Sequence, residues 1–304
     1  MPDETMKNLK ILISPASFKG SLSNMEACAI MKKSVLKIFP HAGITEFPLA
    51  DGGEGTINVI TKITGEKLKY SDVKDPLMRK RRAAWIKIGE TAFIEMAQAA
   101  GLILLKEREK NPLRTTTYGV GELLEKAVLS GCTRIFLGVG GSATSDAGIG
   151  ALTALGLKFY RKDGNLIHPG SGKDLVEISR IDASCLMPEM LRCGITILSD
   201  VENPLYGRNG AAFVYGPQKG ADEETVKLLD RGLRNFALKM EAFSGRHVAS
   251  LPGAGAAGGI AAGLASFLKV KVVSGIETIM EMGKFEKHLK AADIVLTGEG
   301  RIDS

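Results

Sequence analysis

Apolar runs that end in glycine clusters, each followed by a helix-forming segment, are the dominant feature of this sequence. The clearest example covers residues 134–148, where an apolar run stops at Gly138, small hydroxyl residues follow, and an alanine- and leucine-rich segment begins at Gly150. The pattern predicts a strand, a loop nearly free of side chains, and a helix. Such a loop lets backbone N–H groups approach a phosphate closely, although a tight turn that needs only positive φ angles explains it too.

Two similar units stand at the start of the chain. Strands are predicted at residues 9–14 and 45–49, each followed by a loop and a helix, one ending before Pro40 and one near Thr64. Consecutive units of this kind favour a parallel, doubly wound sheet. Ligands of such sheets bind beyond the carboxyl ends of the strands, where Lys19 and Asp51 lie. Both are therefore candidate functional residues, although most lysines and aspartates in loops are only solvated.

The pattern changes between residues 67 and 101, where three short strands joined by turns indicate an antiparallel insertion and a domain boundary. Another strand, residues 195–199, leads into Asp200. An aspartate at this position is suited to be a general base or a Mg²⁺ ligand, or simply caps the turn. Further predicted elements are helices at 122–129, 223–243 and 260–267, and strands at 209–215 and 294–296.

Composition narrows the class of protein. A chain of 304 residues suits one large or two ordinary domains, and its net charge of +6 is compatible with anionic substrates. The basic run at residues 79–82 has no aromatic platform beside it, so we expect a solvated hairpin and no nucleic-acid partner. The four cysteines show no CxxC spacing, and apolar stretches are short. We expect no structural zinc, no membrane partner and a cytoplasmic location.

Two glycine patterns resemble dinucleotide fingerprints, namely Gly253-x-Gly255-x-x-Gly258 and Gly138-x-Gly140-x-x-Ala143. Neither has the flanking strand and acidic residue that would make it specific, and P-loop and protein-kinase signatures are absent from the sequence. Several glycine loops, acidic residues at strand ends and isolated cations together suit phosphoryl transfer, where catalysis is mostly positioning and charge neutralisation. An NAD(P)-dependent oxidoreductase stays open as the alternative.

Longer motifs lie at residues 14–23, 48–56, 111–119, 140–144 with Asp146, 200–205, 210–212 with 216–221, 253–259 and 297–303. Together they resemble the type-1 glycerate kinases. The resemblance covers essentially the whole chain, in order, and long motifs of this kind are specific when they occur together.

This resemblance implies an α/β fold of two domains, with the site in the cleft between them. A discontinuous, Rossmann-like parallel-sheet domain is expected at residues 1–66 and 285–304, and an inserted mixed α/β domain at 67–284. The family continues past Ser304, so we expect the first domain to be truncated here, and it usually has an acidic residue where this chain has Ala16. These departures add a third alternative, a catalytically impaired fragment that binds small anions.

The resemblance also implies an activity, namely ATP-dependent, Mg²⁺-assisted phosphorylation of D-glycerate at the 2-hydroxyl group to give 2-phosphoglycerate. We hypothesise that Lys19 and Arg301 neutralise the glycerate carboxylate or the transferring phosphoryl group. Either Asp51 or Asp200 accepts the proton of the attacking hydroxyl, and the other helps to hold Mg²⁺. A homodimer is left open.

The remaining candidates are assigned to substrate and nucleotide. Ser17 and Asp303 are expected to contact glycerate together with Lys19, Asp51 and Arg301. The nucleotide phosphates are expected at two loops through backbone N–H groups. The residues concerned are Gly140, Gly141, Ser142, Ala143 and Thr144 in one loop, and Gly253, Gly255 and Gly258 in the other.

Overall fold

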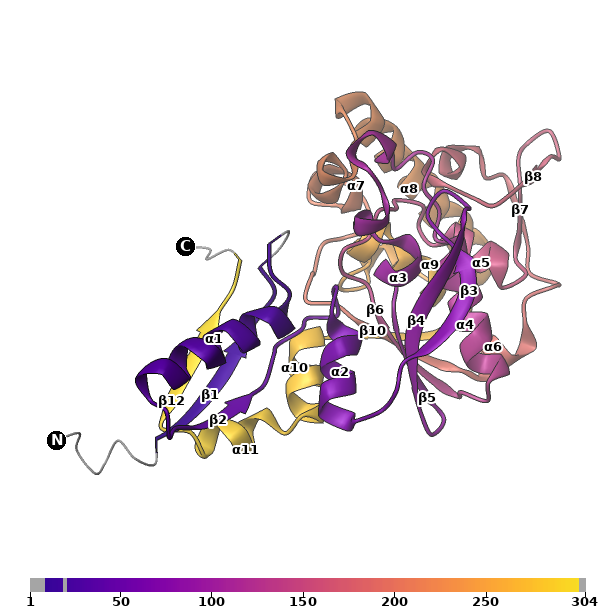
Figure 1. Ribbon diagram of the computed structural model, residues 1–304. Coiled ribbons are helices and arrows are strands. Elements are labelled where there is room, and N and C mark those ends of the chain that lie inside the picture. The colour runs from indigo at the N-terminus through magenta and orange to yellow at the C-terminus, as the bar shows by residue number, and fades with distance from the viewer. Residues whose placement is uncertain (1–8, 19–20, 301–304) are drawn as a thin grey trace.

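A small parallel sheet forms one lobe of the molecule, in a computed structural model that describes residues 9–18 and 21–300 (Figure 1). Its strands are β1 (Lys10–Pro15), β2 (Gly43–Glu46) and β12 (Ile294–Gly298), in the order β12-β1-β2. Ile11 lies opposite Ile294 on one side and Ile44 on the other. The predicted parallel arrangement is confirmed, and it pairs the first strand of the described chain, β1, with the last, β12.

Helix α1 (Asn24–Ile38) covers this sheet and begins where its sequence predicts. The Ser23 hydroxyl accepts a hydrogen bond from Glu26 N–H, and the Glu26 carboxylate accepts one from Ser23 N–H. This reciprocal capping box satisfies N–H groups that a helix start leaves free. Cys28 of the helix is buried together with Ile11 and Ile13 of β1.

A six-stranded mixed sheet forms the other lobe, in the order β11-β10-β6-β5-β4-β3. The strands from β11 to β5 run parallel, and β4 pairs antiparallel with both β5 and β3. The antiparallel strands predicted between residues 67 and 101 are therefore part of the same sheet as the later parallel strands. Their bounds are β3 (Lys69–Lys74), β4 (Lys80–Ile88), β5 (Thr91–Glu95), β6 (Arg134–Gly138), β10 (Gly194–Leu198) and β11 (Lys269–Val273).

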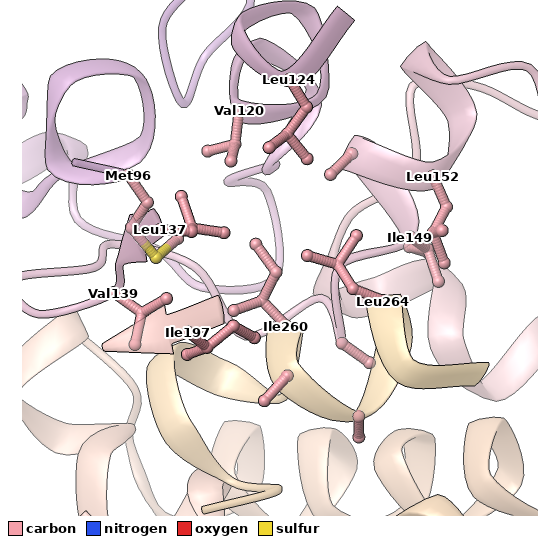
Figure 2. Close-up of a cluster of buried hydrophobic side chains, with 14 of the residues drawn as sticks. Met96, Val120, Leu124, Leu137, Val139, Ile149, Leu152, Ile197, Ile260 and Leu264 are labelled. Carbon is pink, nitrogen blue, oxygen red and sulfur yellow. The ribbon is translucent and has the colours of Figure 1, made fainter. Parts of the chain in front are cut away.

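Helices cover both faces of the large sheet. Successive side chains of a strand point to opposite faces, so neighbouring residues of one strand pack in different clusters. Ile94 of β5 packs in the main core, whereas Phe93 next to it packs in a second cluster. Figure 2 shows the main core, where Leu137 and Ile197 from the sheet meet Ile260. The helices that contribute to it are α4 (Tyr118–Leu129), α5 (Ile149–Ala154), α8 (Glu223–Ser244) and α9 (Ile260–Phe267).

The second cluster is supplied by helices α2 (Thr56–Thr64) and α10 (Gly275–Met282). Ile60 of α2 and Ile279 of α10 are buried with Ile86 and Phe93 of the sheet. The strands of the small sheet fall within residues 1–66 and 285–304, and those of the large sheet within 67–284. The domain boundaries themselves stay a prediction.

The sequence prediction was wrong at residues 209–215, which form helix α7 (Ala211–Tyr215) and no strand. Ala211 and Ala212 are buried, and their small side chains let the short helix pack closely against α8. A run of small residues has no periodicity that separates a strand from a buried helix. Strand β11 was missed as well.

The smaller elements complete the chain. Strands β7 (Lys158–Tyr160), β8 (Leu166–Ile167) and β9 (Arg180–Asp182) form an antiparallel sheet, and the short helices are α3 (Ala97–Ala100), α6 (Pro188–Arg192) and α11 (Phe285–Lys290). Within the described part of the chain, no helix combines the length and apolar character needed to cross a membrane.

Candidate active site

The loop of residues 51–55 follows β2 and leads directly into α2. The Asp51 carboxylate accepts a hydrogen bond from Gly53 N–H at 2.9 Å and is exposed. Gly52 and Gly55 have φ angles of +91° and +90°, which residues with a side chain rarely adopt. The loop is thus a tight turn that presents one carboxylate to solvent.

This loop lies against the carboxyl end of the large sheet. Gly140 N–H donates to the Gly52 carbonyl oxygen at 3.1 Å. A Cβ atom at Gly138 would come within 2.4 Å of that same oxygen, and one at Gly52 within 2.5 Å of the Leu198 oxygen. The glycines are required because no side chain fits between the backbones. As a result, a loop from the small sheet is fixed to the ends of β6 and β10.

Asp200 follows β10 at the same edge, and it is exposed. Its two carboxylate oxygens accept hydrogen bonds from Ser274 Oγ at 2.6 Å and from Ile276 N–H at 3.2 Å. Ser274 and Ile276 belong to the start of helix α10. Asp51 lies against the same helix start, since a Cβ atom at Gly275 would lie 2.0 Å from the Asp51 carbonyl oxygen. The structure therefore brings Asp51 and Asp200 together around the N-terminus of α10.

The loop of residues 140–144 supplies backbone groups beside this carboxylate pair. Gly141 is exposed, with φ +72°, whereas Ser142, Ala143 and Thr144 are buried. Leu102 N–H donates to the Gly141 oxygen, and Ala143 N–H donates to the Ala100 oxygen. Among residues 9–18 and 21–300, the N–H groups of Gly141 and Ser142 have no hydrogen-bond acceptor. Adjacent backbone N–H groups without an acceptor are able to bind an anion.

The second glycine loop is placed differently. Gly255 and Gly258 are buried, and Cβ atoms there would lie 2.3 Å from the Pro204 oxygen and 2.2 Å from the Thr144 oxygen. Close backbone packing thus accounts for both glycines. Gly253 has φ +72° and lies against the Val201 oxygen. The packing places this loop directly behind residues 144–147. The contact of Gly253, Gly255 and Gly258 with nucleotide phosphates stays a prediction.

Both predicted cations and one predicted carboxylate lie outside the described residues. These are Lys19, Arg301 and Asp303. Ser17 is described and is exposed beyond the carboxyl end of β1. Its neighbour Ala16 donates its N–H to the Gly298 oxygen at 2.8 Å, so the ends of β1 and β12 lie together.

A divalent cation is compatible with the acidic residues at this edge. The described part of the chain holds no cluster of three or more histidine, cysteine, aspartate or glutamate side chains suited to a metal. Mg²⁺ does not need one, because it is commonly held by one or two carboxylates together with substrate phosphates and water. Asp51 and Asp200 are exposed and keep lone pairs beyond the hydrogen bonds described above. The pair therefore fits Mg²⁺ bound with a nucleotide.

Glu95 is a buried acidic residue of the site that the sequence analysis missed. It ends β5 opposite Gly138, is 1% exposed, and accepts a hydrogen bond from Ile57 N–H of α2 at 2.7 Å. Burial raises the pKa of Glu95 to about 7, while hydrogen bonds from Gly55, Ile57 and Gln98 oppose the rise. The glutamate inside the apolar run of residues 92–97 was the available signal. The Glu95 carboxylate thus holds the end of the 51–55 loop through hydrogen bonds from the N–H groups of Gly55 and Ile57.

Glu95→Gln is expected to remove a pH dependence of stability. Because the folded-state pKa lies above the ordinary value of 4.5, folding favours the protonated form, so stability is greatest below pH 4.5 and falls as pH rises towards 7. The full loss above pH 7 is about 3 kcal/mol at most. The check is denaturant unfolding at pH 5 and pH 8 of both proteins. An equal pH dependence in the wild type and the variant would contradict the assignment.

Comparison with known proteins decides the family. The sequence profile of the Glycerate kinase family matches residues 11–304. The chain belongs to the glycerate kinase family. The resemblance noted in the sequence is thereby confirmed, and so is the prediction that the chain is a phosphotransferase enzyme.

Relatives of the chain carry consistent names. Glycerate kinase of Halalkalibacterium halodurans is 44% identical over 296 residues, which cover 96% of this chain and 77% of the relative. Glycerate 2-kinase of Escherichia coli is 43% identical and is covered to 78%. A crystal structure of a protein assigned as glycerate kinase 2 from Salmonella typhimurium LT2 superposes with a TM-score of 0.83 at 40% identity, covering 97% of this chain and 79% of that one. The predicted α/β fold is confirmed.

Proposed function

We propose that this chain transfers the γ-phosphoryl group of ATP to the 2-hydroxyl group of D-glycerate and releases 2-phosphoglycerate. The observation that carries the proposal is the contact between the 51–55 loop and the carboxyl ends of β6 and β10. This contact gathers Asp51, Asp200 and the free N–H groups of Gly141 and Ser142 at one edge. The name of the Escherichia coli relative supports the choice of the 2-hydroxyl group.

Each residue has a proposed role in positioning and proton transfer. One of the two aspartates accepts the proton of the attacking hydroxyl, and the other binds Mg²⁺; the roles of Asp51 and Asp200 are left open. When bound, Mg²⁺ neutralises charge on the phosphate oxygens. The N–H groups of Gly141 and Ser142 face the nucleotide phosphates. Ser17, Lys19, Arg301 and Asp303 are proposed to bind glycerate.

The test measures ADP formation in the presence of D-glycerate, L-glycerate or no acceptor, with phosphorus NMR of the product. We expect turnover with D-glycerate, loss of activity after Mg²⁺ removal by EDTA, and 2-phosphoglycerate as the product. Formation of 3-phosphoglycerate would overturn the assigned position. Glycerate binding without turnover would identify a catalytically impaired protein, and NAD(H) binding without glycerate-dependent turnover would favour oxidoreductase chemistry.

The remaining predictions concern cell biology and assembly. A cytoplasmic location, the absence of nucleic-acid and membrane partners, and the open choice between monomer and homodimer come from the sequence alone. Size-exclusion chromatography with light scattering would settle the oligomeric state.

A further inference from the structure

Lys219 is a fully buried lysine directly behind the 140–144 loop. It is 1% exposed and ends a 3₁₀ turn, Pro217–Lys219. Its Nζ atom donates hydrogen bonds to Ser142 Oγ at 3.0 Å and to the Thr144 carbonyl oxygen at 2.5 Å. Lysines are almost never fully buried unless they are paired, so this position requires an explanation.

The lysine is held in place from its own side of the contact. Gly220, which follows it, has φ +90°, and a Cβ atom there would lie 2.4 Å from the Lys110 carbonyl oxygen. The backbone at this position is therefore fixed against a neighbouring segment. Because the backbone of Lys219 is fixed, its side chain sets the positions of Ser142 Oγ and the Thr144 carbonyl oxygen.

A buried carboxylate lies near enough to attract the ammonium group of Lys219. Asp146 is 0% exposed and accepts hydrogen bonds from Thr117 Oγ1 and N–H at 2.8 Å, with further bonds from Gly148 and Gly150 N–H groups. Burial raises the pKa of Asp146, and burial lowers the pKa of Lys219 to about 7 against the attraction of Asp146. Burying two ionisable groups costs free energy of folding, so core packing alone does not explain why Lys219 and Asp146 are buried here.

Backbone hydrogen bonds at Gly141 and Ala143, and the Thr115 hydroxyl that donates to the Ala143 oxygen at 2.8 Å, hold the middle of the loop. Within the described residues, the hydroxyl groups of Thr144 and Ser145 are buried and have no hydrogen-bond partner. Neither Thr144 nor Ser145 therefore holds the loop through its hydroxyl group. The ammonium group of Lys219 thus provides the side-chain contact that joins Ser142 to Thr144 across the turn.

We propose that Lys219 is a positioning residue for phosphoryl transfer, which fixes the 140–144 loop so that the N–H groups of Gly141 and Ser142 face the nucleotide. The inference rests on the proposed function, and it assigns this loop to the nucleotide and not to glycerate. Lys219 itself touches neither reactant. It acts through Ser142 Oγ and the Thr144 oxygen.

Lys219→Met tests the proposal because methionine has a similar length and no donor. We expect KM for ATP to rise by about tenfold or more, as when a hydrogen bond to a charged group is lost, while KM for D-glycerate changes by less than about twofold. Lys219→Arg, which keeps the charge, should lie closer to the wild type. Lys227→Met, on the exposed face of α8, is the matched control and should leave both constants unchanged.

Two results would overturn the proposal. One is an unchanged KM for ATP in folded Lys219→Met, and the other is an equal rise of both KM values. A purely structural role would lower kcat and the melting temperature without separating the two constants. If the wild type shows no glycerate-dependent turnover, the proposed function fails, and ATP binding measured by calorimetry in the same proteins then decides the role of Lys219.

If Lys219→Met does not fold, the proposal is tested by hydrogen exchange on the wild-type protein. The Ala143 and Leu102 amides close the loop through hydrogen bonds, so their hydrogen exchange reports on its order. Asp146 is the charged group that faces Lys219; Lys110 lies near Gly220 but is paired with Glu107. Protection corrected for the intrinsic rate should fall by about threefold or more between pH 6 and pH 8, as the lysine loses its proton. Unchanged protection contradicts the proposal. Repeating the experiment in Glu95→Gln removes the Glu95 carboxyl group, whose pKa burial also raises to about 7.

Discussion

Replacing Asp200 by Asn is expected to lower kcat by at least about 100-fold if Asp200 is the general base. The amide cannot accept the proton of the attacking hydroxyl, and it carries no negative charge towards Mg²⁺. The measurement is kcat at saturating ATP and D-glycerate, with the melting temperature recorded alongside. Asp200 is exposed, so the loss should appear in the rate more than in the stability.

A matched control is needed because Asp200 also holds the start of α10 through Ser274 and Ile276. Ser274→Ala removes the N-cap hydroxyl, costs about 1 kcal/mol of stability, and leaves the Asp200 carboxylate in place. We expect this variant to keep kcat within a few-fold of the wild type. A near-normal kcat in Asp200→Asn would exclude Asp200 as the base and leave Asp51 as the candidate, testable by Asp51→Asn.

Gly140→Ala is expected to reduce kcat/KM by about 100-fold or more, although no functional side chain is removed. The new Cβ atom would lie 2.5 Å from the Gly53 Cα atom, so the 51–55 and 140–144 loops must move apart. A displacement of about 1 Å between positioned reactants is enough for a loss of this size. The measurement is kcat/KM for both substrates, compared with the melting temperature.

Gly194→Ala is the control for this variant. Gly194 begins β10, and a Cβ atom there would meet nothing within 4 Å. The activity of Gly194→Ala should match the wild type. A Gly140→Ala protein with full activity would show that the contact between the two loops does not position the reacting groups.

Local signals explain the parts of the fold that the sequence predicted correctly. Ser23 and Glu26 form a capping box that marks the start of α1, and the apolar face of α8 repeats with helical period. The same reasoning failed at α7, whose small residues carry no period, and at β11, whose side chains are half-buried or exposed at the edge of the sheet. Burial by distant segments decides such elements, and a local pattern does not contain it.

The site was predicted less completely than the fold. Asp51 and Asp200 could be named because each follows a predicted strand, and parallel strands place such residues at one edge. Glu95 was missed although it interrupts an apolar run, and Lys219 has no such local signal, since its role comes from burial against residues far away in the sequence, such as Ser142. The glycines at 255 and 258 show the reverse case, where a motif suggested ligand contact and the structure also provides a packing reason.

The clamped turn at Gly52 has a mechanical consequence. Asp51 is carried by the small sheet in sequence, yet its turn is wedged against Gly138 and Leu198 of the other lobe. A displacement of Asp51 relative to the ends of β6 and β10 would have to break this close backbone packing. Ser17 lies at the same edge of the small sheet as Asp51, because β1 and β2 are parallel neighbours and Leu49 N–H donates a hydrogen bond to the Pro15 oxygen at 3.0 Å. The wedge therefore ties the loops beyond β1 and β2 to the strand end that carries Asp200.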